Sequence, residues 1–429
     1  MHRRLLLPTT TLFVGILASF WGCSDGATEP VPVEENLALL TGFEVRDGVG
    51  FTTHGEELTF LSDVEAQSAR VRISQEGTSV EGRPIHLVRV GHPQPPTDEG
   101  IATGQAILIV GSQHGNEPAG REAALQFLRD LAFTQEDEVL DVLTNATVLL
   151  IPSANPDGRV AGTRVNADQV DINRDHLDLA SPEARAIARI LRDLRPDVVL
   201  DAHERPTGTT PDVEVLWPRN LNVYEPVRDL SQELVEQRLF GDLAEGGRSV
   251  ALFSPDPGGA GDENETILRN TVGLRHSLGV LVESAGGRPA VERVAVHWEV
   301  FRSALRFLED RSSEIVAAVT AAPETKAAVG RDRSEPFYLF GADNDPPAPD
   351  QILDPPPCAY VLTAEQEAVL QPQIDLFSLQ TEPTAGTDVL LPMDQPFMTV
   401  IPLLADSRAR KEIVEGVALV TEEECAVIH

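Results

Sequence analysis

Four short apolar runs constrain the fold of this chain most strongly, because each has the length of one strand and ends in polar or turn residues. They are QAILIVG (105–111), ATVLLIPSANPDG (146–158), DVVLDAHE (197–204) and GVLVESAG (279–286). Continuous apolar runs of this kind are typical of strands that are covered on both faces. Segments with helical spacing separate them, so the pattern predicts an α/β sandwich with helices on both faces of a sheet.

One of the helical segments also carries a clear start signal. In residues 181–196, Ser181, Pro182 and Glu183 suit the cap, the first position and the charged first turn of a helix. A second helical segment covers residues 117–132, and a strand is expected in GTSVEGRPIHLVRVG (77–91). In sheets of this type, ligands gather at the carboxyl ends of the strands. His114, His203 and Glu283 all fall at such ends.

The balance of charge excludes some classes of partner. The chain has 34 Lys and Arg against 68 Asp and Glu, for a formal net charge of −34. Such a surface repels phosphate backbones and anionic lipid headgroups, so no nucleic-acid binding is expected. The acidic excess is interpreted as a means of solubility.

The N-terminus indicates export. Residues 1–23 begin with a basic stretch followed by an apolar run, as in a signal peptide, and Gly22–Cys23 resembles a bacterial lipoprotein cleavage site. Residues 24–40 are polar and are expected to form a flexible linker. The mature protein is therefore predicted to be periplasmic, an outer-membrane lipoprotein or secreted, and lipidation and plain secretion both stay open. Membrane attachment is expected only through a lipid on Cys23, because no other stretch is long and apolar enough.

The last quarter of the chain is predicted to be a separate module. Residues 321–336 are interpreted as a boundary, and CAYVLTAEQEAVLQPQI suggests a strand followed by a short helix. Residues 330–429 would then form a small α/β module of unknown role. Cys358 and Cys425 lie in it, and they could pair in an oxidising compartment or could both be buried and free.

The polar residues at the strand ends are candidates for a zinc site. Catalytic zinc is typically held by three His or carboxylate ligands, with one position left for water. His114 and Glu117 are three positions apart and can point the same way, and His203 at another strand end is the best third ligand. A set of two histidines and one glutamate is what hydrolytic zinc sites use.

The order of these residues along the chain resembles the zinc carboxypeptidases (funnelins). HGNE (114–117), GTRVNADQVDINRDH (162–176), LDAHE (200–204) and LVES (281–284) follow in the family's order, and EGTSVEGRPI (76–85) resembles the segment that opens many of these domains. The resemblance covers about residues 50–310. It implies a three-layer α/β/α sandwich around a mixed, mostly parallel sheet, with a catalytic domain at 41–322.

The resemblance also implies roles for individual residues. His114, Glu117 and His203 would bind one Zn²⁺ per chain, and Glu283 would be the general base acting on a zinc-activated water. Arg164 would polarise the scissile carbonyl and bind substrate. Asn173 and Arg174 would hold the terminal carboxylate of the substrate, and Asp171 would orient His114. His176, Asp175, Glu204 and Arg275 are further candidates near the site.

Some features depart from the family pattern. The segment 254–277 contains no Tyr, although well-studied members have one in the loop before the catalytic Glu. The same segment carries an acidic cluster that indicates a preference for basic C-terminal residues of the substrate. Its members are Asp256, Asp262, Glu263 and Glu265.

The expected function is removal of a C-terminal residue from peptides or proteins by zinc-dependent hydrolysis. Two alternatives stay open. One is a zinc amidase or deacylase acting on cell-wall peptides or N-acyl amino acids. The other is a non-catalytic, zinc-dependent peptide-binding protein, which the missing Tyr motivates. Glu283 favours an enzyme, because a binding protein needs no base at that position.

Overall fold

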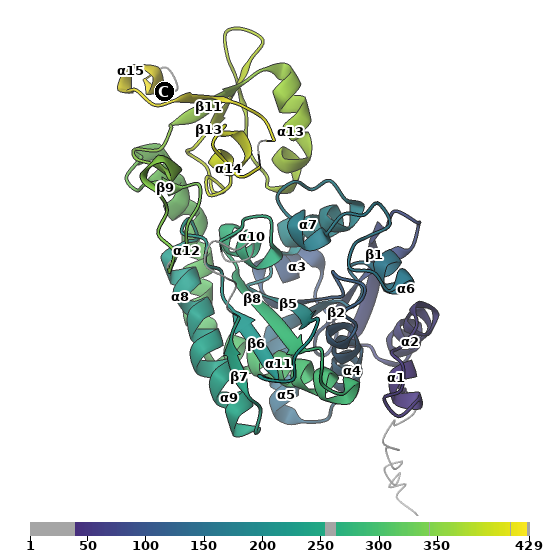
Figure 1. Ribbon diagram of the computed structural model, residues 1–429. Coiled ribbons are helices and arrows are strands. Elements are labelled where there is room, and N and C mark those ends of the chain that lie inside the picture. The colour runs from purple at the N-terminus through teal and green to yellow at the C-terminus, as the bar shows by residue number, and fades with distance from the viewer. Residues whose placement is uncertain (1–38, 254–262, 343, 412, 427–429) are drawn as a thin grey trace, which may run out of the picture. The chain divides into compact units, whose positions relative to one another are not determined.

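A sheet of eight strands runs through the centre of the structure, a computed structural model that describes residues 39–253, 263–342, 344–411 and 413–426 (Figure 1). The predicted signal peptide and most of the predicted linker lie outside the described residues. In spatial order the strands are β1 (Val71–Thr78), β2 (Pro84–Val90), β4 (Ala146–Ile151), β3 (Gln105–Gly111), β5 (Val198–Arg205), β8 (Leu278–Ala285), β6 (Val213–Leu216) and β7 (Val250–Leu252).

The sheet is mixed. Four of its seven pairings are parallel, namely β4 with β3, β3 with β5, β5 with β8 and β6 with β7. The other three are antiparallel. Every residue of β4, and every residue of β3 and β5 except one terminal residue each, is buried. Because alternate side chains of a strand point to opposite faces, both faces of these strands must be covered.

Helices provide this cover. The helices α4 (Ala119–Phe133) and α11 (Ala290–Asp310) pack against each other and against β3 and β5, with α5 (Asp137–Asn145) beside β4. The helices α3 (Asp98–Thr103), α7 (Pro182–Leu194) and α10 (Leu268–Leu274) contact β3, β1 and β8 and lie across the sheet from α4 and α11 (Figure 1). The predicted three-layer α/β/α sandwich is therefore confirmed.

The predicted start of α7 is also confirmed. The side chain of Ser181 accepts a hydrogen bond from the backbone N–H of Ala184, and Pro182 occupies the first turn. The helix ends at Arg195, which adopts the left-handed conformation that commonly closes a helix. The remaining helical segments before residue 333 are α1 (Gly42–Val45), α2 (His54–Gln67), α6 (Pro156–Ala161), η1 (Ile172–Arg174), α8 (Glu225–Glu233), η2 (Leu234–Leu239), α9 (Phe240–Glu245) and α12 (Ser312–Asp332).

The last part of the chain has a sheet of its own, of four antiparallel strands. Their order is β12 (Glu382–Pro383), β13 (Val389–Pro392), β11 (Ala359–Leu362) and β14 (Val417–Leu419). Short elements complete this part: β9 (Phe337–Tyr338), η3 (Pro349–Gln351), β10 (Ile352–Leu353), α13 (Ala364–Leu376), α14 (Ile401–Ala405) and α15 (Glu422–Cys425). The predicted strand and helix after residue 357 are β11 and α13. The segment interpreted as a boundary lies largely in α12, which continues to Asp332.

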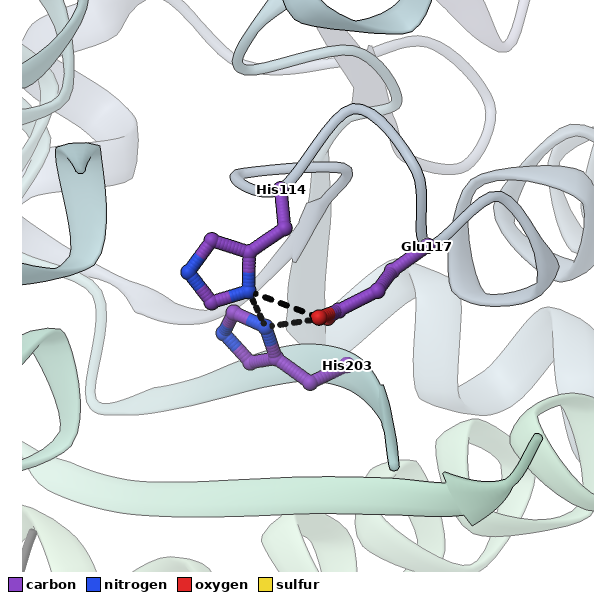
Figure 2. Close-up of side chains that lie close together, drawn as sticks. All are labelled: His114, Glu117 and His203. Atoms are coloured by element: carbon purple, nitrogen blue, oxygen red, sulfur yellow. Dashed lines mark hydrogen bonds and ion pairs between the residues drawn. The ribbon is translucent and has the colours of Figure 1, made fainter. Parts of the chain in front are cut away.

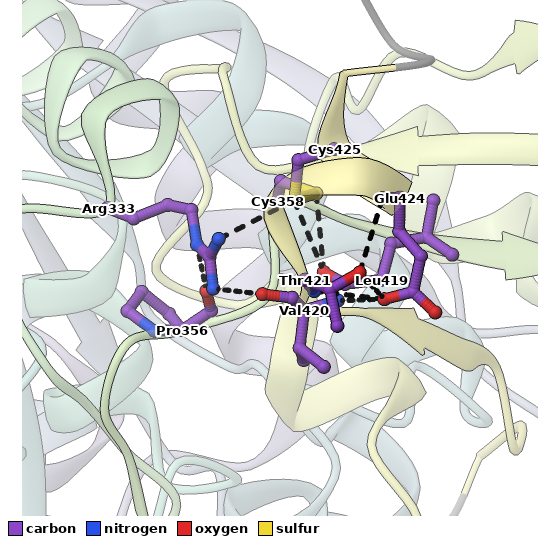
Figure 3. Close-up of a disulfide and its surroundings, with 8 residues drawn as sticks. All are labelled: Arg333, Pro356, Cys358, Leu419, Val420, Thr421, Glu424 and Cys425. Carbon is purple, nitrogen blue, oxygen red and sulfur yellow. Dashed lines mark hydrogen bonds between the residues drawn. A yellow bond between two sulfur atoms is a disulfide. The ribbon is translucent and has the colours of Figure 1, made fainter.

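Cys358 and Cys425 form a disulfide bond, which settles the alternative that the sequence left open (Figure 3). The bond ties the residue before β11 to the end of α15. Arg333 adds hydrogen bonds to the carbonyl oxygens of Pro356, at 2.6 Å, and Val420, at 2.7 Å. The C-terminal strand is thereby held to the segment that follows α12. Among the helices of the described residues, none has the length and apolar character needed to cross a bilayer.

Candidate metal and active site

Three neighbouring strands of the central sheet bring the candidate site residues together at their carboxyl ends. His114 and Glu117 lie in the turn between β3 and α4, and His203 lies near the end of β5. Glu283 of β8 is directly paired with His203 in the parallel register. The turn packs tightly against the start of α6, because a Cβ atom on Gly115 would lie 1.9 Å from the carbonyl carbon of Gly158. Only glycine fits there.

The ligand atoms of His114, Glu117 and His203 converge. Figure 2 shows both imidazole rings turned toward the carboxylate of Glu117, and the three ligand atoms lie within 4.8 Å of one another. His114 Nδ1 is 3.0 Å from one carboxylate oxygen, and His203 Nδ1 is 2.9 Å from the other. The two Nδ1 atoms are 3.0 Å apart. All three residues are buried, and only a small part of the Glu117 carboxylate reaches solvent.

The ionisation states of this group are strongly coupled. Burial by itself opposes a charge on Glu117, but His114 and His203 hold the pKa of its carboxyl well below the usual value. Burial likewise lowers the pKa of His203, but Asp201 and Glu117 together raise it well above that of a free imidazole. The carboxylates of Asp201 and Glu117 therefore favour positive charge at this position, which a bound metal cation could supply.

Each imidazole also has a carboxylate on its other nitrogen. Asp171 Oδ1 lies 3.1 Å from His114 Nε2, and Asp201 Oδ1 lies 2.8 Å from His203 Nε2. Asp201 is buried and also accepts hydrogen bonds from Gln113, at 2.6 Å, and Asn173, at 3.0 Å. Carboxylates in such positions fix the tautomer and the orientation of metal-binding histidines.

Asp201 was not predicted from the sequence, although a signal for it was present. Residues two apart in a strand point to the same face, so Asp201 had to lie beside His203 once residues 197–204 were taken as a strand. Asp171 lies next to His114, as the resemblance to the zinc carboxypeptidases implied. Gln113 was not predicted, although it directly precedes His114 in the turn after β3.

The donor set fits zinc. It consists of two imidazole nitrogens and one carboxylate oxygen close to one another, and the other nitrogen of each imidazole is already engaged by a carboxylate. This matches the protein ligands of catalytic zinc sites, which leave a position for water or substrate. Among the described residues, this is the one cluster of three His, Cys, Asp or Glu side chains that could hold a metal ion.

Glu283 lies beside this cluster and is half-buried. Burial raises the pKa of this carboxyl to about 8, opposed by His203 and reinforced by the nearby carboxylate of Glu117. A carboxyl with a raised pKa next to a metal site is suited to accept and return a proton near neutral pH. A divalent cation held by His114, Glu117 and His203 would favour its ionised form.

Arg164 reaches the cluster from the loop after α6. Its Nε donates to Asp171 at 2.9 Å, and one terminal nitrogen lies 3.2 Å from His114 Nδ1 and 3.5 Å from a Glu117 oxygen. The side chain is 43% exposed, so it can also meet a ligand from solvent.

The other two predicted substrate-binding residues differ in how they are engaged. Asn173 is buried, and its amide is engaged at both ends. It donates to Asp201 at 3.0 Å, and its oxygen accepts from the backbone N–H of Leu268 at 2.8 Å. Arg174 is half-buried and donates to the carbonyl of Asn173 at 2.7 Å, with no carboxylate paired to it in the part of the chain that the structure describes. Arg174 therefore has guanidinium nitrogens available for a ligand, whereas the side-chain amide of Asn173 is already hydrogen-bonded.

Comparison with known proteins supports this interpretation of the site. Residues 58–194 match the family model of the zinc carboxypeptidases (Peptidase_M14). This stretch of the chain is similar to the zinc carboxypeptidase domain. Carboxypeptidase 2 of Trichophyton equinum is 30% identical over 287 residues, which are 62% of this chain and 49% of that protein. Carboxypeptidase E of Caenorhabditis elegans is 36% identical over 120 residues, 24% of this chain and 25% of that protein.

The fold of the zinc carboxypeptidase domain recurs in solved structures. A Burkholderia mallei structure assigned to a carboxypeptidase has a TM-score of 0.50 and 20% sequence identity, and the match covers 60% of this chain and 68% of that one. The chain spans about half the length of the Trichophyton relatives that it matches. The family implies zinc, and the His114, Glu117 and His203 set fits it.

Most of the further candidates make hydrogen bonds to other parts of the protein around the site. His176 contacts Gln113 at 2.6 Å, and Asp175 accepts two backbone hydrogen bonds at residues 180 and 181. Glu204 accepts from the N–H of Ala119 at the start of α4, and its own N–H donates to Glu117 at 3.1 Å. Arg275 points away from the site and donates to the carbonyl of Leu376.

The acidic cluster of segment 254–277 is only partly described. Asp256 and Asp262 lie outside the described residues. Glu263 and Glu265 are both paired with Arg410 of the C-terminal part. These two carboxylates therefore share one cationic partner within the protein, which reduces the negative charge that they offer to a basic substrate side chain.

Proposed function

We propose that this protein is a zinc-dependent metallocarboxypeptidase that hydrolyses the C-terminal bond of a peptide or protein, with one Zn²⁺ per chain. The observation that carries the proposal is the placement of Glu283 in register with His203, beside the converging His114, Glu117 and His203 side chains. The match to the zinc carboxypeptidase family supports it. A protein that only bound peptides would have no use for a carboxyl at that position.

Bound zinc supplies a Lewis acid that allows water to ionise near neutral pH. Glu283 accepts the proton of the attacking water and later delivers it to the nitrogen of the leaving amino acid. The position of Glu283 suits this exchange, because its half-buried carboxyl lies beside the ligand cluster, where it can take and give a proton. Asp171 and Asp201 keep the two imidazoles turned toward Glu117 throughout.

Arg164 and Arg174 act on the substrate. Arg164 lies at the edge of the ligand cluster, where its guanidinium can stabilise the negative charge that develops on the carbonyl oxygen. Arg174 can pair with the terminal carboxylate, for which a guanidinium has matching geometry. Asn173 helps to place Arg174. Its backbone carbonyl oxygen accepts a hydrogen bond from Arg174, and its side chain is hydrogen-bonded to Asp201 and to the backbone of Leu268.

The setting of the enzyme is also a proposal. We infer export by the signal at residues 1–23, with either a lipid on Cys23 or release of the soluble protein into the periplasm or medium. The disulfide between Cys358 and Cys425 supports an oxidising compartment. The division into a catalytic domain at 41–322 and a module at 330–429 likewise stays a proposal.

The test combines metal analysis with a panel of peptides. The expected result is about one zinc per chain and release of a single C-terminal residue, which a chelator abolishes and added zinc restores. Peptides with an amidated C-terminus serve as the control, and they should be poor substrates. Zinc without turnover of any peptide would instead favour an amidase, a deacylase or a binding protein. A chain that binds no zinc would contradict the proposal.

A further inference from the structure

Two segments of the chain meet beside His203 and Asp201. The first, residues 172–181, contains Asn173 and Arg174, and the second, residues 263–277, leads into β8 and Glu283. They are hydrogen-bonded to each other. The N–H of Leu268 donates to Asn173 Oδ1 at 2.8 Å, and the N–H of His176 donates to the carbonyl of Thr266 at 3.2 Å.

This pair of segments is connected directly to the candidate metal ligands. The amide of Asn173 lies 2.9 Å from His203 Nε2 and donates to Asp201 at 3.0 Å. A shift of residues 263–268 would therefore move the N–H of Leu268, and with it the amide that contacts His203.

The C-terminal part of the chain binds the second segment through Arg410. Its guanidinium pairs with Glu263 and, at 3.4 Å, with Glu265. The side chain of Glu265 is fully buried, and its Oε1 atom has no hydrogen-bond partner among the described residues. A buried carboxylate depends strongly on its cationic partner, because removing that partner leaves an uncompensated charge away from water.

The neighbouring residue Lys411 binds the first segment. Its Nζ lies 2.6 Å from the carboxylate of Asp178, and Gln373 of α13 donates to the carbonyl of the same residue at 2.6 Å. Two consecutive residues thus hold one segment each. Thr399 donates to the carbonyl of Leu274 at 2.7 Å, which adds a third attachment on the second segment.

We infer that Arg410, with Lys411 beside it, is a positioning residue that holds segments 172–181 and 263–277 together and so places Arg174 for the terminal carboxylate of the substrate. The inference rests on the proposed carboxypeptidase function and gives the C-terminal part a role in it. The C-terminal part then holds the two segments around Arg174 in place, although it supplies none of the predicted metal ligands or substrate-binding residues.

The test replaces Arg410 in the full chain. Arg410→Met removes the charge, Arg410→Lys retains it, and Arg410→Met with Glu265→Gln removes the charge without leaving a buried carboxylate unpaired. Arg408→Met is the matched control, because Arg408 pairs with Asp406 inside the C-terminal part rather than with either segment. Zinc content, melting temperature, kcat and KM are measured for each variant.

Arg410→Met is expected to raise KM for peptides with a free C-terminal carboxylate about tenfold, with kcat within about threefold and zinc content unchanged. Arg410→Lys should recover part of the loss, and Arg408→Met should stay within about twofold of the parent protein. The double variant should keep the raised KM. A KM within about twofold of the parent in both Arg410→Met variants would overturn the inference, as would a loss of zinc and kcat without a change in KM.

Hydrogen–deuterium exchange provides a readout that does not depend on turnover. In Arg410→Met, the amides of residues 172–178 and 263–274 should exchange about tenfold faster, whereas Arg408→Met should leave them unchanged. If the parent protein hydrolyses no peptide but this difference in exchange appears, the positioning stands and the proposed function fails. If peptides are hydrolysed and exchange is unaffected by Arg410→Met, the positioning is wrong and the proposed function stands.

Discussion

His203 and Arg174 lie on two sides of the same site, and they are held in different ways. His203 is buried, and Glu117 and Asp201 each lie within 2.9 Å of one of its two ring nitrogens. Arg174 is half-buried and donates to a backbone carbonyl next to it. The metal-binding side is thus complete within the protein, whereas the substrate-binding side keeps guanidinium nitrogens available.

The difference follows from what each side must bind. A small cation needs several ligands held in fixed positions, so the cost of burying them is offset by carboxylates and amides behind them. A peptide terminus brings its own charge, so the protein can leave the matching cation partly in water until the substrate arrives. We expect substitutions on the metal side to act through zinc affinity and those on the substrate side through KM.

The largest effect should come from Glu283, which serves neither side. Glu283→Gln keeps the size of the side chain but removes the proton acceptor, so kcat should fall by roughly 10²- to 10⁴-fold. Zinc content should be unchanged, because the three ligand side chains and the carboxylates behind them stay in place. Steady-state assays with metal analysis of the same samples test this. Turnover retained in Glu283→Gln would mean that another group acts as the base.

A second prediction compares the two carboxylates behind the imidazoles. Asp201→Asn should weaken zinc binding roughly 10- to 100-fold, the usual effect of losing such a partner. Asp171→Asn should weaken it less, because the Asp171 side chain is 23% exposed, whereas that of Asp201 is 1% exposed. Competition with a chromogenic chelator gives both affinities. A larger loss in Asp171→Asn would contradict the view that burial decides the difference.

On the substrate side, Arg174→Met should raise KM for peptides with a free carboxylate roughly tenfold to thirtyfold. This is the lower part of the range for hydrogen bonds to charged groups, since water reaches the guanidinium. Zinc affinity should stay within about twofold. Amidated peptides are the control, and their slow turnover should not change further. An equal loss on both kinds of peptide would show that Arg174 does not bind the terminal carboxylate.

The smallest effect on activity is expected from the disulfide, which is remote from both sides. Its removal in Cys358→Ser with Cys425→Ser opens a loop of 67 residues and should destabilise the C-terminal part by about 2–4 kcal/mol. At temperatures below the melting transition, kcat and KM should stay within about twofold. Thermal unfolding and activity at one low temperature are measured together. A rise in KM without a change in melting temperature would contradict this prediction.

The sequence predicted the strands of the metal side well, for a physical reason. The strands β3, β5 and β8 are buried on both faces, so they appear as uninterrupted apolar runs, and the polar residues that end them stand out. Parallel strands bring those ends to one edge, which is why local sequence patterns indicate His114, Glu117, His203 and Glu283 as one group.

Other features depended on contacts between distant parts of the chain. The role of Asn173 in substrate binding stays a prediction, and the sequence did not show that its side chain contacts Asp201 and the backbone of Leu268, 95 positions away. The charge on Glu263 and Glu265 was interpreted as a pocket for basic side chains, yet Arg410 is paired with both. No local sequence pattern predicts these hydrogen-bond and ion-pair partners, because they come from distant parts of the chain that only the fold brings together.

By itself, then, the sequence indicated the order of strands and helices and the polar residues at the strand ends, because apolar periodicity and residue spacing are local properties. The role of Glu283 as base and the place of Asp171 beside His114 were implied by the resemblance to the zinc carboxypeptidases. The tertiary structure alone decided that Asp201 stands behind His203 and that the two cysteines pair. It also decided that Arg410 and Lys411 bind the segments around Arg174. These contacts join residues up to 233 positions apart, and their stabilisation exists only when the chain is folded.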